Sequence, residues 1–190
     1  MTGIMMRIQR AVRRFRSDRK GVGAVEFALI APVLIVLYMG SLEVSVAMSV
    51  NKKVARAASA IADLVTQDKE VDKAYLATMV DVGQSVITPF RTDGLKVRIT
   101  GIAIDGSKTA RVAWSWDEKK NRPYVVNSVT TIPSELAIAN TFLVRTEVEL
   151  DHRLLLVLPG AKDLDIKTLT MRKTYHLVPR LGTDVVCSNC

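Results

Sequence analysis

The chain has 190 residues and a formal net charge of +8. Seven basic residues and one acidic residue lie in the first 20, so this segment carries +6 and the rest of the chain carries only +2. This distribution excludes a uniformly basic protein, because the positive charge belongs to a short N-terminal tail.

The basic tail directly precedes an apolar run. Lys and Arg are retained on the cytoplasmic side of a membrane, so we expect a cytoplasmic N-terminus and an exported body. Ile8, Val12 and Phe15 have helical spacing, which suggests that the tail lies along an anionic membrane surface. A nucleic-acid-binding arm is the rival interpretation, but such an arm has no need to adjoin a membrane span, and we predict no nucleic-acid partner.

The apolar run contains no charged residue from Phe27 to Leu42. As a helix, residues 22–42 would rise roughly 31 Å, which is enough to cross a bilayer core. Glu26 stands at the start of this span, and an ionised side chain at mid-membrane costs on the order of 2.5–3.5 kcal/mol. We therefore expect Glu26 to pair with another charge. The plainer alternative is that it extends to the cytoplasmic interface.

Other residues of the span indicate contact between helices. Pro32 predicts a bend or a local loosening. Gly40 and Ser41 allow another helix to approach closely, which favours an assembly surface over a passive anchor. Glu43 is a second carboxylate near the exported end, and it either pairs or marks the point where the helix enters water.

An ordinary secretory signal is a further alternative, because residues 45–47 and 58–60 resemble small-residue cleavage sites. The length of the apolar run argues against it, as do Glu43 and the lysine pair at 52–53.

The string GVGAVEFALIAPVLIVLYMGSLE resembles the opening of TadE-like pseudopilins of the tight-adherence (Flp-type) pilus system, with Gly21, Glu26 and Phe27 placed as in a class III (prepilin-type) signal. The resemblance implies that a prepilin peptidase cuts between Gly21 and Val22 on the cytoplasmic side and that the apolar helix stays on the protein. Glu26 would become the fifth mature residue.

The chemistry of these residues is consistent with that processing. Gly21 lets an extended backbone enter a narrow protease cleft. Cleavage would create an ammonium group at Val22, which the Glu26 carboxylate of a neighbouring chain could neutralise. Such a pair would set the axial stagger between helices, as a buried polar pair fixes register in coiled coils.

Beyond the span, residues 51–67 predict a continued helix with a narrow apolar stripe. We expect a first break near Thr66 to Lys73, then a second helix from Val71 to about Ile87 that Pro89 ends.

From Leu95 the apolar period changes to two, which indicates an antiparallel sheet. Gly101 is expected at a bulge, and residues 105–108 at a hairpin connection. The next strand is expected to place Ala110, Val112, Trp114 and Trp116 on one side, as core residues.

Residues 133–136 predict a short helical turn, followed by a long strand from Phe142 to Leu158 and a fourth strand within Ile166 to Val178. Opposite charges alternate along the long strand and predict cross-strand pairing in solvent rather than catalysis. They are Arg145, Glu147, Glu149, Asp151 and Arg153.

The motif Cys187-Ser188-Asn189-Cys190 is compatible with a redox dithiol, half a zinc site or a small structural disulfide. An exported location favours the disulfide, and pairing with another chain stays open. A zinc site would need His152 and His176, whose spacing does not support it, and we expect no metal or other cofactor. No sequence pattern of a nucleophilic triad, zinc protease or phosphate loop occurs, so we expect no enzyme.

The sequence thus predicts an α+β, pilin-like fold: a long N-terminal membrane helix extended into an exported head with a small helix and an antiparallel sheet of about four strands. The expected boundaries are a leader at 1–21, a transmembrane helix at 22–50 and a head domain at 51–190. We expect a minor pseudopilin in the inner membrane that acts in assembly of a pilus or a related secretion machine. Its expected partners are the prepilin peptidase, other pseudopilins or pilin subunits, the inner-membrane platform of the secretion machine and the lipid bilayer. The alternatives are a signal-anchored binding or sensor module and the major fibre subunit, which the size of the sheet domain disfavours.

Overall fold

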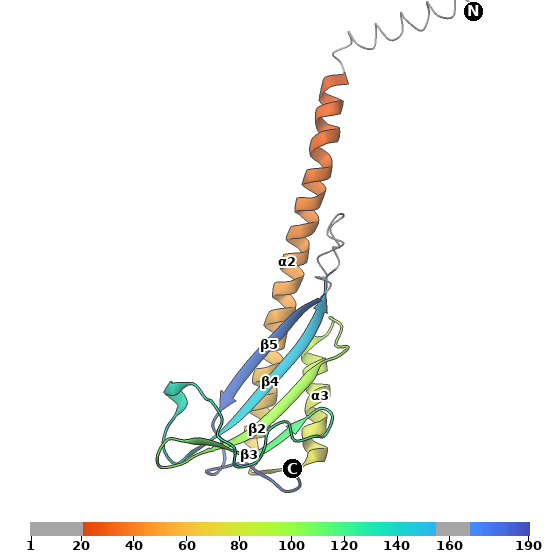
Figure 1. Cartoon of the computed structure of the whole chain (residues 1–190). Coiled ribbons are helices and arrows are strands. Elements are labelled where there is room, and N and C mark those ends of the chain that lie inside the picture. The colour runs from red at the N-terminus through yellow and green to blue at the C-terminus, as the bar shows by residue number, and fades with distance from the viewer. Residues whose placement is uncertain (1–20, 155–167) are drawn as a thin grey trace, which may run out of the picture. The chain divides into compact units, whose positions relative to one another are not determined.

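A computed structural model of the chain describes residues 21–154 and 168–190 (Figure 1). The chain divides into two compact units, residues 1–44 and 45–190. The basic tail, with its stripe of Ile8, Val12 and Phe15, lies outside the described residues. The same holds for residues 155–158, the predicted end of the long strand.

Helix α2 runs from Val22 to Gln67 without interruption and continues through Pro32. The two helical stretches predicted at 22–50 and 51–67 are therefore one element, and it ends where the polar segment predicted a break. Its residues up to Val44 belong to the first unit and its remaining residues to the head.

In the head, α2 contributes a buried stripe at helical spacing. The buried side chains are Val50, Val54, Ala57, Ala58, Ile61, Ala62, Val65 and Thr66. Burying an aliphatic side chain of this kind contributes about 1.5–3 kcal/mol, so this half of α2 is held by the core rather than by helix propensity alone.

Helix α3 runs from Lys73 to Ile87. The prediction placed its start at Val71, two residues early, because Asp72 is the N-cap. The side chain of Asp72 accepts a hydrogen bond from the N–H of Tyr75 at 2.7 Å. At the other end of α3, the ammonium group of Lys53 donates to the carbonyls of Val86 (3.1 Å) and Thr88 (2.7 Å), which joins α3 to α2.

The main sheet has four antiparallel strands in the order β3-β2-β4-β5. Their bounds are Lys96–Ile104 for β2, Ala110–Asp117 for β3, Thr141–Arg153 for β4 and Thr168–Leu177 for β5. The predicted α+β class and the four strands are confirmed. Within the described residues, β4 ends at Arg153, which pairs with Thr168, and the predicted extension over residues 155–158 lies outside them.

The register between β2 and β3 shifts at Gly101. Gly101 pairs with Trp114 and Ile102 pairs with Val112, so Ala113 of β3 is the extra residue. The expectation that four alternate residues of β3 share one side is therefore wrong. Trp114 and Trp116 belong to the main core cluster, whereas Ala110 belongs to a second cluster with Ile102, Ile104 and Leu143.

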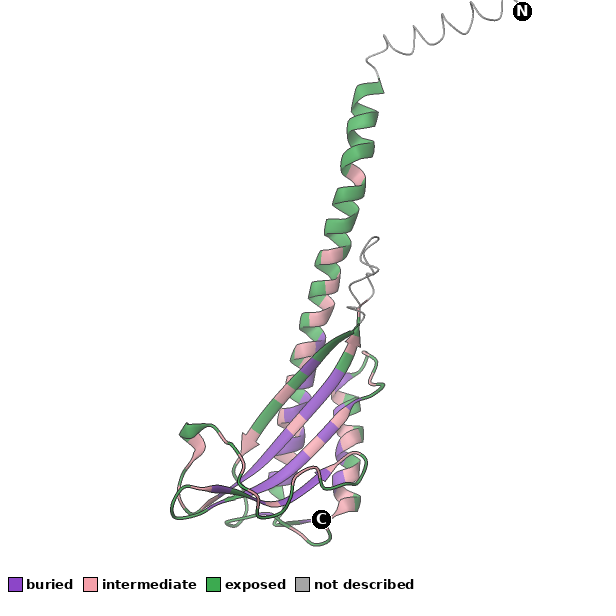
Figure 2. Ribbon diagram, viewed as in Figure 1, coloured by how far each residue is buried: buried purple, intermediate pink, exposed green. Residues whose placement is uncertain are grey.

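The main core lies between the sheet and the layer formed by α3 and the head part of α2, as the buried residues in Figure 2 show. The second cluster is covered by Ile132 and Leu136, and Leu136 ends the short helix η2, Ser134–Leu136, at the predicted helical turn. A small parallel sheet that the sequence did not predict joins β1, Glu70–Val71, to β6, Val186–Cys187.

Candidate membrane and assembly segment

Residues 22–44 of α2 expose most of their apolar side chains, and this part of the helix is mostly coloured as exposed in Figure 2. Phe27 is 69% exposed and Leu29 is 70% exposed. No residue is buried in the 18-residue stretch of α2 that has the highest mean hydropathy. By length and composition, α2 is the one helix in the described part of the chain that is able to cross a membrane. An apolar surface of this extent is unfavourable in water, so the segment requires lipid or other helices around it.

Glu26 lies one helical turn after Val22, and residues four apart share a helix face. Its side chain is exposed, and no residue within 21–154 or 168–190 forms an ion pair with it. Any charge partner of Glu26 therefore lies outside these described ranges.

The glycines of this segment are not required by packing within the chain. Among the described residues, a β-carbon added at Gly21, Gly23 or Gly40 would meet no atom within 4 Å. Space around Gly40 leaves room for a neighbouring helix, whereas Gly21 precedes the first residue of α2. Glu43 is half-buried on the same helix.

The two cysteines lie far along the sequence from this segment, at the C-terminal end of the head. Cys187 and Cys190 are joined by a disulfide, with their α-carbons 5.6 Å apart. Within the described ranges, no group of three or more His, Cys, Asp or Glu side chains is placed to hold a metal ion.

The charged residues of β4 lie on the sheet face away from the main core. Glu149 accepts hydrogen bonds from the ammonium group of Lys96 (2.7 Å) and from the guanidinium of Arg172. These two cations lower the pKa of the Glu149 carboxyl, with Lys96 the larger cause. The predicted cross-strand pairing is therefore present, but Glu149 is only 8% exposed rather than solvated.

Arg145 is equally buried, because the loop after β3 covers it. The centroid of the Tyr124 ring lies 4.6 Å from the guanidinium carbon of Arg145. The hydroxyl of Tyr124 donates a hydrogen bond to the carboxylate of Glu147 at 2.7 Å. The pKa of Tyr124 is raised, mainly by burial and next by the hydrogen bond to Glu147. This arrangement fixes the loop to the sheet and offers no exposed acid-base pair.

Comparison with protein families gives one match: the family model of TadE-like proteins fits residues 21–63. Comparisons with curated proteins and with solved structures give no match. The matched residues include Gly21, Val22, Glu26, Phe27, Pro32, Gly40 and Glu43. The resemblance predicted from the N-terminal string is confirmed, because the TadE-like family model matches this segment.

Proposed function

We propose that this protein is a minor pseudopilin that helps to assemble a tight-adherence (Flp-type) pilus or a related secretion machine. The single observation that carries the proposal is the coincidence of the TadE-like match with an exposed apolar helix that begins beside a carboxylate. The family supports a pilus-associated role, and the helix suits a single-pass membrane anchor with the head on its C-terminal side. We place residues 22–44 in the inner membrane and the head, residues 45–190, outside the cytoplasm.

In this proposal a prepilin peptidase removes residues 1–21. Gly21 supports the cut because its lack of a side chain suits a narrow cleft and because no atom of the described residues lies within 4 Å of a β-carbon placed there. The new ammonium group at Val22 then lies next to the α2 N-terminus, one turn from Glu26.

The function of Glu26 is then to pair with the Val22 ammonium of a neighbouring subunit. Both groups would be desolvated in a helix bundle, so either one alone is costly there and the pair specifies a single stagger. The partners are other pseudopilins or pilin subunits, the inner-membrane platform of the machine and the lipid around the helices.

Intact mass of the protein extracted from membranes tests the processing step. The expected mass corresponds to a chain that begins at Val22. A Gly21→Leu variant, matched in all but the cleavage residue, should keep residues 1–21. A mature chain that begins at Met48 or Ile61 would instead show an ordinary secretory signal and overturn the proposal.

Pilus output tests the assembly role separately. Deletion of the protein should abolish or strongly reduce surface fibres, and re-expression should restore them. Normal fibres in the deletion strain, with the processing confirmed, would leave a membrane-anchored binding or sensor module as the better explanation.

A further inference from the structure

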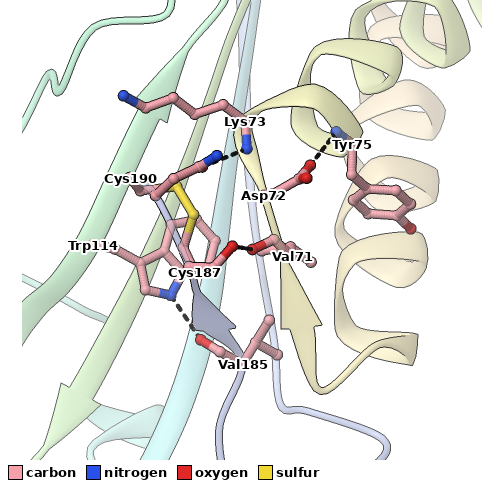
Figure 3. The surroundings of a disulfide bond; sticks show 10 residues. Val71, Asp72, Lys73, Tyr75, Trp114, Val185, Cys187 and Cys190 are labelled. Atoms are coloured by element: carbon pink, nitrogen blue, oxygen red, sulfur yellow. Dashed lines mark hydrogen bonds between the residues drawn. A yellow bond between two sulfur atoms is a disulfide. The ribbon is translucent and has the colours of Figure 1, made fainter.

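Residues 180–190 are attached to the head at three separate places. At the first, Arg180 pairs with Asp63, and its backbone N–H donates to the carbonyl of Thr66 at 2.8 Å. At the second, Val185 is buried, and its carbonyl accepts a hydrogen bond from the indole N–H of Trp114 at 2.7 Å. The third attachment is made by residues 186–190, which lie against β1 and the start of α3 (Figure 3).

The backbone part of the third attachment is small. The N–H groups of Val186 and Ser188 donate to the carbonyls of Lys69 and Val71, each at 3.0 Å. Each strand of this parallel pair has two residues. A two-stranded sheet of this size is not stable by itself, so another contact must keep residues 186–190 in place.

Asn189 supplies a contact to α3. Its side-chain oxygen accepts a hydrogen bond from the N–H of Lys73 at 2.8 Å. Lys73 is the first residue of α3, and such an N–H has no acceptor within the helix. Asp72 satisfies a second N–H of the same turn, that of Tyr75, so local and distant residues share the capping of α3.

The disulfide constrains Asn189 directly. Cys187 and Cys190 close a ring of four residues that contains Ser188 and Asn189. Both sulfur-bearing side chains are half-buried and pack against the main core, whereas Ser188 and Asn189 are exposed. The ring thus holds Asn189 at the α3 N-terminus, while Ser188 and Asn189 stay exposed and the two cysteines stay partly exposed.

We propose that the Cys187–Cys190 disulfide is a redox-controlled clasp: it holds residues 186–190 against β1 and the first turn of α3, and its reduction by a dithiol releases this segment while the rest of the head stays folded. Val185 and Arg180 have attachments of their own, so release ends before Val185. The bond is then a modification site whose co-substrate is a dithiol or, in the opposite direction, a disulfide oxidant.

The exchange balances in two steps. One thiolate of the dithiol attacks a sulfur of the pair and forms a mixed disulfide, and the other cysteine leaves as a thiolate. The second thiolate of the reagent then attacks the mixed disulfide, so the reagent becomes a disulfide. Two electrons pass to the protein, and the two cysteine thiolates take up two protons to end as thiols. These are the two cysteines of the chain, so reduction acts on this bond alone.

Hydrogen exchange measured by mass spectrometry, on the full chain in detergent micelles, tests the clasp with and without dithiothreitol. Alkylation after reduction should add two labels. We expect peptides covering residues 69–76 and 186–190 to exchange about five- to tenfold faster on reduction, as loss of single hydrogen bonds implies. Peptides from β2 and from residues 180–185 should not change.

Two variants separate the bond from the capping residue. Cys187→Ser with Cys190→Ser should reproduce the reduced pattern without reagent. Asn189→Ala should keep the disulfide and speed exchange only near Lys73, and Ser188→Ala, which removes a long 3.4 Å contact to Val71, should resemble the wild type. Unchanged exchange at 69–76 on reduction would overturn the clasp, and so would faster exchange throughout β2, which would make the bond a general stabiliser. These readouts do not depend on processing or pilus output.

Discussion

The indole ring of Trp114 occupies the space that a side chain at Gly101 would need. A β-carbon placed on Gly101 would overlap Nε1 of Trp114 and lie 2.7 Å from Cζ of Phe142. Trp114 cannot move away easily, because the same nitrogen donates to the carbonyl of Val185. Gly101 is therefore required by the packing of its neighbours at the point where the β2–β3 register shifts.

Gly101→Ala should lower the free energy of unfolding by about 1–3 kcal/mol, the usual cost of forcing extra volume into a packed core. Chemical denaturation in detergent, followed by tryptophan fluorescence, measures the change. Gly106→Ala is the matched control, since its β-carbon would meet its nearest neighbour, Oδ1 of Asn140, at an ordinary 3.6 Å. Equal stability of the two variants would contradict the packing argument.

Lys53→Met should destabilise the head by about 1.5–3 kcal/mol, because the charged group donates to the last carbonyls of α3. Methionine keeps the length and removes the donor. The shift in the thermal unfolding midpoint provides the measurement. Lys52→Met, at the exposed neighbouring position, should change the midpoint little, and a similar loss in both variants would show that charge alone matters.

Glu149 should make the stability of the head sensitive to acid. Its bonds to Lys96 and Arg172 lower the folded-state pKa below the ordinary value of 4.5. Stabilisation by this group is therefore fully present above the unfolded pKa and is lost as the pH falls through the folded one. Glu149→Gln should cost about 1–2 kcal/mol at pH 7 and flatten the decline of stability below pH 4.5.

Urea titrations at several pH values check that prediction. Glu135→Gln, at an exposed carboxylate of η2, should leave the acid dependence close to wild type. If Glu149→Gln lost stability equally at pH 7 and at low pH, the linkage to protonation would be wrong.

Glu26→Gln should keep membrane insertion, because it makes the span more apolar, and should impair assembly through loss of the proposed pair with Val22 of a neighbour. Surface pilus output and membrane fractionation give the two readouts. Glu43→Gln is the matched control at the second carboxylate of the helix. Wild-type output from Glu26→Gln would show that Glu26 only reaches the interface.

Sequence patterns were sufficient for the long elements. The α2 span, the stripe of residues 51–67 and the alternation in β2 and β4 each repeat over enough residues to specify an element. They were not sufficient where a partner strand changes the phase. The alternation of Ala110, Val112, Trp114 and Trp116 is unbroken in sequence, but the extra residue Ala113 sends the two halves to opposite faces.

Other features were missed because they depend on distant residues. Glu70 and Val71 form a strand only because residues 186–187 pair with them, and two residues carry no periodicity. Arg145 and Glu149 were expected in solvent because their charge pattern is typical of an exposed face, and only the folded chain shows what covers them. The N-terminal segment was predictable because its residue types, rather than tertiary contacts, define it.

The contacts of residues 180–190 also determine when the head can complete its folding during synthesis. Lys73 and Asn189 are 116 residues apart, and Asp63 and Arg180 are 117 apart. Translation proceeds from the N-terminus, so α2 and α3 are complete long before their last partners leave the ribosome, and loop closure over such separations is slow. The head consequently reaches its final packing only once residues 180–190 have been made, and until then the N–H of Lys73 lacks its acceptor on Asn189.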